Sequence, residues 1–489
     1  MTDPMTLATR NLIIEALQAA PDADTSDPDF HTMFTPSSHR EALAPDATVV
    51  KGARGTGKTY WAKALADPAL REVAARSYLM PRLSRTEVVT AFGSAGGDEP
   101  VFPGKRAIEG LVQEFGKEDK LGARDLWSAV VLMALKVPQV IALDSWIERI
   151  RWTARNGEAY ESAVRRADRE TREQGKTLIL LFDQLDRLHS KRAQIDLLLS
   201  GLLEVALELR LTTTALRAKI FVRPDLYESA PRNFADASKL DANAADLSWS
   251  RENLYGLFFH QLGNHASEAA RAFRDSTEGD WRAEEGGRYI APVEVLADQK
   301  AQERLFVTLA GPFMGTDRRK GHTYTWLPNH LQDGLGRISP RTLLSTLRKA
   351  AERTDSADAT HPLPLYYEAI RESLSHAASV RVQELKDDLA WAALAVELLA
   401  GSQVPMEPSA VQYAWNTRGF SARLREVLER ETAGGGPRDA GDPVALLGEL
   451  EKLGVITYRT NGAVDLPDIY RLAFDIGRKG GVKRSTSPS

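Results

Sequence analysis

The 489-residue sequence contains no cysteine. Disulfide bonds, thiolate catalysis and cysteine-ligated zinc are therefore excluded, and the absence fits a reducing cytoplasm. The nine histidines form no H-E-x-x-H motif and no cluster, so we predict no structural metal site.

The sequence also lacks an excess of one charge and a long uninterrupted hydrophobic run. Sixty-three basic and 67 acidic residues give a net charge of −4, which provides no overall attraction to nucleic acid or to an anionic membrane. The most apolar run, 126–143, contains Lys136 and Pro138 and predicts a buried helix rather than a membrane span. The N-terminus has no signal-peptide pattern. We therefore expect a cytoplasmic protein without a membrane partner.

The sequence does contain a phosphate-loop motif. Residues 52–59 match G-x-x-x-x-G-K-[ST], between a predicted strand (47–51) and a predicted helix (60–65). Glycines let backbone N–H groups approach phosphate oxygens, and the N-terminus of the following helix attracts the anion. Lys58 would reach the β- and γ-phosphates, and the hydroxyl of Thr59 would hold Mg²⁺. A glycine-rich turn that matches by chance is the alternative, and the flanking strand and helix count against it. The predicted nucleotide-binding residues are Gly52, Ala53, Arg54, Gly55, Thr56, Gly57, Lys58, Thr59 and Tyr60.

A second motif begins at residue 176. The segment 176–182 contains five consecutive apolar residues and predicts a buried central strand, and Asp183 follows at its carboxyl end, where open α/β sheets bind their ligands. Asp183 would hold Mg²⁺ together with Thr59. The next residue, Gln184, can orient a water molecule but cannot accept its proton. Asp186 is the nearest candidate base, or else it is the N-cap of a helix that begins near Leu188, and the sequence leaves both open.

Two arginines are further candidates for the site. Arg223 follows a predicted strand over 218–222, and we favour a position near the γ-phosphate over a surface salt bridge. Ser339 and Pro340 predict a helix start, which puts Arg341 in the first turn. A cation there opposes the helix dipole, so Arg341 is expected to serve another charge, such as a nucleotide phosphate.

The pattern of elements predicts an α/β protein with a parallel sheet, followed by helices. The expected domains are an N-terminal helix and lead-in (1–46), a P-loop core (47–235) with a helical insertion at about 95–175, a helical lid (236–375) and a winged-helix-like domain with a basic tail (376–489). Within the core we also predict a strand over 76–80 and a helix from about Arg85.

The winged helix is predicted from helices followed by two short strands that meet at Asn461-Gly462, a hairpin signal. Its candidate recognition helix, 443–452, carries two acids and one base, which is poor for DNA binding. The basic cluster of 478–484 is expected to be a tail. We therefore favour a protein partner at the winged helix, with DNA as the alternative.

The phosphate loop, the Asp183 strand end, Arg223, the helix start at Arg341 and the winged helix occur in a consistent order. This order resembles prokaryotic P-loop ATPases of the additional-strand class, close to the AAA+, STAND and initiator-type ATPases. The resemblance implies an αβα core and a helical lid, with Arg223 and Arg341 as the two nucleotide sensors. Gln184 departs from the glutamate usual in that class, and no trans-acting arginine finger can be assigned, so a homo-oligomer is left open.

The resemblance implies an ATP- and Mg²⁺-dependent switch or scaffold, and such switches include proteins of bacterial antiviral or conflict systems. One alternative is a DNA-binding ATPase of the initiator or loader type. A second is an ATP-binding scaffold with negligible turnover, which Gln184 keeps open. Adenine is favoured over guanine because no N/T-K-x-D motif follows the core.

Overall fold

A computed structural model describes residues 4–17, 27–93, 101–116, 121–284, 286–429, 436–437 and 439–479 of the chain. It divides into two compact units. Asp22–Ser248 form the core unit, and Met1–Pro21 with Trp249–Ser489 form the C-terminal unit. The segment 1–46, predicted as one lead-in, is thus shared between the two units, and the core extends to residue 248 rather than 235.

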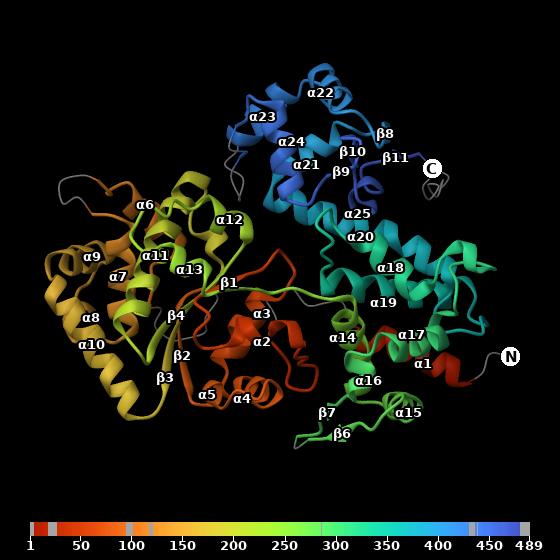
Figure 1. The fold of residues 1–489 in the computed structure, drawn as a ribbon, viewed down its shortest axis with the longest axis horizontal. Helices are drawn as coiled ribbons and strands as arrows, with labels where there is room; N and C mark the ends of the chain where they lie inside the picture. The colour runs from red at the N-terminus through yellow and green to blue at the C-terminus, as the bar shows by residue number, and fades with distance from the viewer. Residues whose placement is uncertain are drawn as a thin grey trace. The chain divides into compact units, whose positions relative to one another are not determined.

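The core unit is built on a sheet of five parallel strands (Figure 1). These are β1 (Val49–Lys51), β2 (Thr86–Phe92), β3 (Thr177–Phe182), β4 (Leu216–Val222) and β5 (Ala244–Asp246). Their order across the sheet is β2-β3-β4-β1-β5. The phosphate-loop strand β1 and the aspartate-bearing strand β3 are therefore separated by one additional strand, β4.

Alternate residues of the strands pack on opposite faces of the sheet, as the pleat of a β-strand requires. Ile179 and Leu181 of β3 pack in one core with Trp61, which lies in the helix after the phosphate loop. Leu180 and Phe182 pack in a second core with Trp127 of the insertion. Both faces are thus covered, which explains the continuous apolar sequence of β3.

Helices of the core unit cover both sides of the sheet (Figure 1). They are η1 (Ser37–His39), α2 (Arg40–Leu43), α3 (Lys58–Ala66), α4 (Pro68–Ser77), α5 (Pro81–Ser84), α6 (Lys105–Val112), α7 (Ala123–Ala134), α8 (Pro138–Ile141), α9 (Trp146–Arg155), α10 (Gly157–Glu173), η2 (Leu185–Arg187), α11 (Arg192–Thr212), α12 (Pro224–Ser229) and α13 (Ser238–Asp241). The insertion between β2 and β3 consists of α6 to α10.

The predictions for residues 76–92 were wrong. The predicted strand 76–80 is the end of α4 and a turn, because Asp67 caps that helix by accepting from the N–H groups of Ala69 and Leu70. The predicted helix from Arg85 is the edge strand β2, whose β-branched residues pair with β3.

The C-terminal unit begins with a helical part. Its elements are α1 (Pro4–Ala16), α14 (Arg251–Asn264), α15 (Glu268–Ser276), β6 (Arg282–Ala283), β7 (Tyr289–Ile290), α16 (Val293–Leu296), α17 (Gln299–Ala310), η3 (Arg318–Lys320), α18 (Thr323–Leu331), α19 (Pro340–Ala357) and α20 (Tyr367–Asp388). No helix among the described residues combines the length and apolarity needed to cross a bilayer.

A winged helix completes this unit. Its elements are α21 (Ala390–Glu397), β8 (Gln403–Val404), α22 (Pro408–Thr417), α23 (Phe420–Glu429), α24 (Pro443–Lys452), β9 (Thr457–Tyr458), β10 (Val464–Asp465), α25 (Asp468–Arg471) and β11 (Gly477–Arg478). The predicted hairpin is the antiparallel pair β9–β10, and Met406 bridges to Val464 beside it. The predicted basic tail, 478–484, was wrong at its start, because Arg478 belongs to β11 and pairs with Asp465 and Asp468. Its remainder from 480 lies outside the described residues.

Candidate nucleotide-binding site

The phosphate loop joins the end of β1 to the start of α3. Gly55 and Gly57 have φ angles of 76° and 100°, in the left-handed region that favours glycine. At Gly52 a Cβ atom would lie only 2.5 Å from the Thr56 hydroxyl oxygen. The backbone conformation of the loop therefore requires glycine at these positions. The loop ends at the carboxyl edge of the sheet, where the first N–H groups of α3 have no acceptor within the helix.

Lys58 lies across this loop. Its Nζ donates to the carbonyl oxygens of Gly52 (2.9 Å) and Ala53 (3.1 Å). Burial lowers the pKa of Lys58, and the charges of Asp186 and then Asp183 oppose that shift. The Lys58 amine is thus close enough to the carboxylates of Asp183 and Asp186 to be affected by their charges. This is the place expected for a lysine that binds the phosphates of a nucleotide.

Asp183 is almost fully buried, at 2% exposure. Neither of its carboxylate oxygens has a well-aligned hydrogen-bond partner among the described residues. Burial raises its pKa, and the Gln184 N–H, the Lys58 charge and the Thr59 hydroxyl act in the opposite direction. A buried carboxylate without partners is unfavourable on its own. Oxygen donors from Asp183 and Thr59 are the kind that Mg²⁺ prefers, so the residues fit that ion.

Gly93 supports Asp183 from the end of β2. Its φ is 139°, and a Cβ atom there would lie 3.3 Å from the Cβ of Asp183. A cavity of about 420 Å³ opens at this point, lined by Thr90, Gly93, Asp183 and Lys63 among others. The sequence alone did not single out Gly93, because its neighbour Asp183 is distant along the chain.

Residues 184–187 turn sharply away from β3. Gln184 has a φ of 56°, in the left-handed region, and Asp186 lies in the short helix η2. The N-cap interpretation of Asp186 was wrong, because the next α-helix, α11, begins only at Arg192 and has Lys191 as its N-cap. Asp186 is half-buried, and its charge acts on Lys58 more strongly than that of any other carboxylate.

Arg223 lies at the carboxyl end of β4 and is 8% exposed. It does form a salt bridge, with Asp225, but a buried one rather than one on the surface, and its role near the γ-phosphate stays a prediction. Its guanidinium donates to both carboxylate oxygens of Asp225, at 3.0 and 3.1 Å. Arg192 donates to the same carboxylate at 3.1 Å. Although burial acts to raise it, the charges of Arg223 and Arg192 hold the pKa of Asp225 below its usual value. Asp225 thus fixes the orientation of Arg223.

Arg341 lies in the C-terminal unit, in the first turn of α19. Pro340 occupies the first helical position as predicted. The Arg341 guanidinium lies 3.6 Å from the carboxylate of Glu384, which also pairs with Arg381 at 3.1 Å. Its predicted role toward the nucleotide stays a prediction.

The lead-in segment is fastened to the core by two buried residues that the sequence did not reveal. His39 accepts from the Trp61 indole N–H at 2.9 Å and donates to the Ser248 carbonyl at 3.0 Å. Lys219 of β4 donates to three carbonyl oxygens of the segment 42–47, at 2.8 to 2.9 Å. Burial lowers the pKa of His39 to about 4 and that of Lys219 to about 7.

The glycine-rich loop, the aspartate after β3 and the strand between β1 and β3 define the class of fold. It is the α/β P-loop fold of the additional-strand class, here followed by helices and a winged helix.

Comparison with known proteins gave only structural likenesses. The chain matches no family model and no curated protein. It is similar to the ORC2 protein of Aeropyrum pernix in a structure of ADPNP–ADP complexes, at 11% identity and a TM-score of 0.37, over 86% of this chain and 84% of that one. It is also similar to CDC6P from Pyrobaculum aerophilum, at 13% identity and a TM-score of 0.28, over 86% and 83% of the two chains. At such low identities and scores these likenesses assign no function to the chain.

Proposed function

We propose that this protein binds ATP with Mg²⁺, hydrolyses it, and uses the change of nucleotide to alter the state of its C-terminal unit. One observation carries the proposal: the carboxylate of Asp183, buried and without a well-aligned hydrogen bond among the described residues, lies at the same sheet edge as Lys58 and Thr59 of the phosphate loop. A cation there would offset the cost of burying that charge. The stability of the α/β fold does not by itself require a buried carboxylate beside a lysine and a threonine.

The loop residues would each have a separate task. Backbone N–H groups of 52–59 would bind the phosphate oxygens. Lys58 would exchange the carbonyl oxygens of Gly52 and Ala53 for the β- and γ-phosphates. Thr59 and Asp183 would hold Mg²⁺, which when bound supplies positive charge against the charge of the transferred phosphoryl group.

Hydrolysis needs a group that accepts the proton of the attacking water. Asp186 is the better candidate, because Gln184 cannot accept a proton and Asp186 belongs to the turn whose charge acts on Lys58. The water oxygen would bond to the γ-phosphorus, the bond from that phosphorus to the bridging oxygen would break, and ADP and phosphate would leave. The water proton would pass to the Asp186 carboxylate.

Arg223 and Arg341 would act as sensors that distinguish bound ATP from ADP. Arg223, oriented by Asp225, would contact the γ-phosphate from β4. Arg341 would exchange its Glu384 partner for the nucleotide, so that its ion pair in the C-terminal unit depends on whether ATP is bound.

The second candidate function is a DNA-binding ATPase of the initiator or loader type. An exposed cationic hairpin in the same unit as the winged helix favours it. The helix before the wing, α24, argues the other way, since its polar end carries Glu449, Glu451 and Lys452. A protein partner at the winged helix is the other alternative.

The assignment of the base is tested by phosphate release at saturating MgATP. Asp186→Asn should lower kcat by about 10²- to 10⁴-fold, the usual contribution of a general base, while leaving ATP affinity within a few-fold. Gln184→Glu serves as the matched control, and it should not restore turnover when combined with Asp186→Asn. Turnover at the wild-type rate in Asp186→Asn would rule out this role.

A further inference from the structure

The C-terminal unit carries a hairpin, 313–322, whose tip consists of three consecutive cations. Arg318, Arg319 and Lys320 form the short helix η3, and all three are exposed. None of the three side chains forms an ion pair with a described residue. The nearest acid in sequence, Asp317, uses its carboxylate to accept the backbone N–H of Arg319 at 2.8 Å. In a chain of net charge −4, this turn is a local excess of positive charge, with three cations beside the one carboxylate of Asp317.

The hairpin is held in one conformation by its own backbone. The Met314 N–H donates to the Gly321 carbonyl at 2.9 Å, and the Thr323 N–H donates to the Pro312 carbonyl at 3.2 Å. Phe313 and His322 form an antiparallel bridge between these bonds. A surface fixed in advance loses less entropy when it binds a partner than a free chain would.

The base of the hairpin is continuous with the winged helix through α18. Gly321 packs against Trp326, whose ring stacks on His330 at a centroid distance of 4.0 Å. The His330 Nε2 lies 3.6 Å from an oxygen of Asp468, at the start of α25. Helix α18 therefore joins the cationic tip to the winged helix within a single unit.

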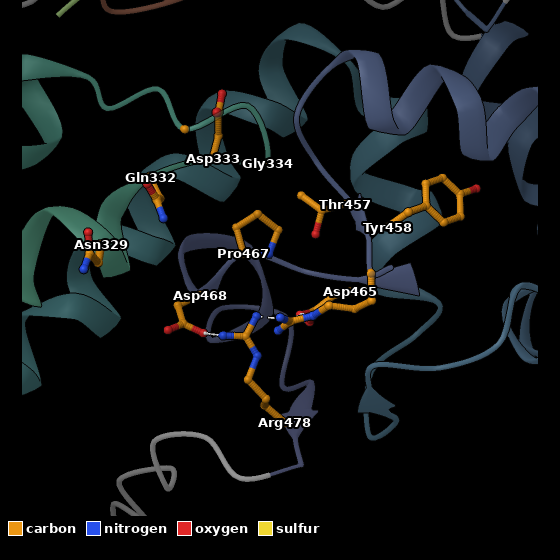
Figure 2. A pocket seen from close by; sticks show the side chains of 12 residues that line it. Asn329, Gln332, Asp333, Gly334, Thr457, Tyr458, Asp465, Pro467, Asp468 and Arg478 are labelled. Carbon is orange, nitrogen blue, oxygen red and sulfur yellow. Dashed lines mark hydrogen bonds and ion pairs between the residues drawn. The ribbon is translucent and has the colours of Figure 1, made fainter. Parts of the chain in front are cut away.

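The charges at the other end of α18 are, by contrast, compensated. A cavity of about 330 Å³ lies there, and in it Arg478 is 3.0 Å from Asp465 and from Asp468. Figure 2 shows the Arg478 guanidinium between these two carboxylates. Asp333 in its wall is paired with Arg337 at 2.8 Å. This cavity joins the wing to the helices and offers no excess charge to a ligand, so the hairpin tip is the stronger candidate for an interaction.

The chemistry of the tip fits phosphate diesters. Guanidinium groups bind phosphate oxygens in a bidentate manner, and an ammonium group adds a point charge. A membrane-binding surface would also need exposed apolar side chains to insert. The neighbouring residues Gly315, Thr316 and Asp317 provide none.

We infer that Arg318, Arg319 and Lys320 form a contact surface for the phosphate backbone of duplex DNA, bound without regard to sequence. The inference does not depend on the proposed ATPase activity, because it concerns residues outside the phosphate loop and is measured without nucleotide. Base-specific contacts are not part of it, since the tip carries only cations and a short polar turn.

Binding of a labelled duplex to the full chain, measured by fluorescence anisotropy over a salt series, tests the inference. The triple variant Arg318→Ala/Arg319→Ala/Lys320→Ala should weaken binding about tenfold or more at low salt. It should also reduce the slope of log K against log salt by about 2 to 3, because each lost phosphate contact removes about 0.9.

Two comparisons make the result specific. The triple variant Arg165→Ala/Arg166→Ala/Arg169→Ala removes three exposed cations from α10 and should leave affinity and slope unchanged. A single Lys320→Glu variant should also weaken binding. The inference is overturned if the wild-type chain does not bind DNA, if the hairpin triple variant keeps the wild-type slope, or if it loses binding to phosphatidylserine vesicles while DNA binding is intact.

Discussion

His39 is a buried imidazole with a fixed partner on each ring nitrogen. Because Nδ1 accepts from Trp61, the proton must be on Nε2, which faces the Ser248 carbonyl. The neutral ring satisfies both bonds, whereas a second proton would remove the acceptor that Trp61 needs. Protonation is thus coupled to the attachment of the lead-in segment beside the phosphate loop.

This coupling predicts a pH dependence of the free energy of unfolding. The pKa of His39 is about 4 in the fold, where burial lowers it, against 6.5 for the model imidazole. Below pH 6.5 the unfolded chain therefore binds a proton that the fold does not. The stability is fully present above pH 6.5 and is lost as pH falls toward 4, by about 1.4 kcal/mol per pH unit and ~3 kcal/mol in all.

Urea unfolding at several pH values between 7 and 4 measures this loss. His39→Gln is the matched variant, since an amide can donate and accept but does not titrate in this range. We expect it to be less stable than wild type at pH 7 and to show a shallower fall toward pH 4. Equal slopes for the two proteins would contradict the assignment to His39.

For single residues, the sequence predicted a place in the site where the signal is a motif of neighbouring residues. The places of Gly52, Lys58, Thr59 and Asp183 at the sheet edge could be predicted because their motifs are local, and their roles toward a nucleotide stay predictions. His39, Lys219, Asp225 and Gly93 could not be predicted, because each acts through a partner brought close only by the fold. Asp186 is intermediate: the sequence offered two roles, and the start of α11 at Arg192 removes one of them.

Among the elements, the N-terminal helix α1 has the most specific attachment. Arg10 is fully buried and donates to the carbonyl oxygens of Pro364 (3.2 Å), Ala359, His361 and Leu363 (each 3.1 Å). These acceptors lie in the turn that follows α19. One guanidinium thus binds four backbone carbonyl oxygens of this turn, of which that of Pro364 belongs to a buried residue.

Arg10→Met should therefore leave those carbonyl oxygens unsatisfied and release α1. We expect a loss of about 2–4 kcal/mol, comparable to breaking other buried charged hydrogen bonds. Hydrogen exchange of the α1 amides measures the release, and exchange should accelerate there before the rest of the unit. Arg10→Lys keeps the charge without the planar fork and should be intermediate. Unchanged protection of α1 in Arg10→Met would contradict this role.

The strands and helices differed in how well their patterns predicted them. β3 was predicted correctly because residues 178–182 are five consecutive apolar residues. β4 is interrupted by Arg217 and Lys219, but its three apolar residues 220–222 indicated a buried strand. β2 is an edge strand whose three middle residues are half-buried, and its Thr86-to-Phe92 sequence contains no continuous apolar run like that of β3. The predicted strand at 76–80 was wrong because α4, which begins after its N-cap Asp67, continues to Ser77 and is followed by a turn.

For the whole molecule, the main departure from the predicted order is that the chain passes between the two units twice. It begins in the C-terminal unit with α1, builds the core from 22 to 248, and returns at residue 249. No sequence pattern could reveal this, because Arg10 and its acceptor Pro364 are 354 residues apart. A discontinuous unit offers two covalent connections through which a change at the phosphate loop can act on the winged helix.

Nucleotide binding at the phosphate loop is tested most directly by a calorimetric titration of the full chain with ATP, in the presence and in the absence of Mg²⁺. Wild type should bind one ATP and should bind it at least several-fold more weakly when Mg²⁺ is removed. Lys58→Ala should abolish detectable binding or turnover, whereas Lys63→Ala, on the same helix but paired with Asp27 at 3.3 Å, should retain both. If Lys58→Ala keeps wild-type binding and turnover, the phosphate loop is not the nucleotide site and the account is wrong.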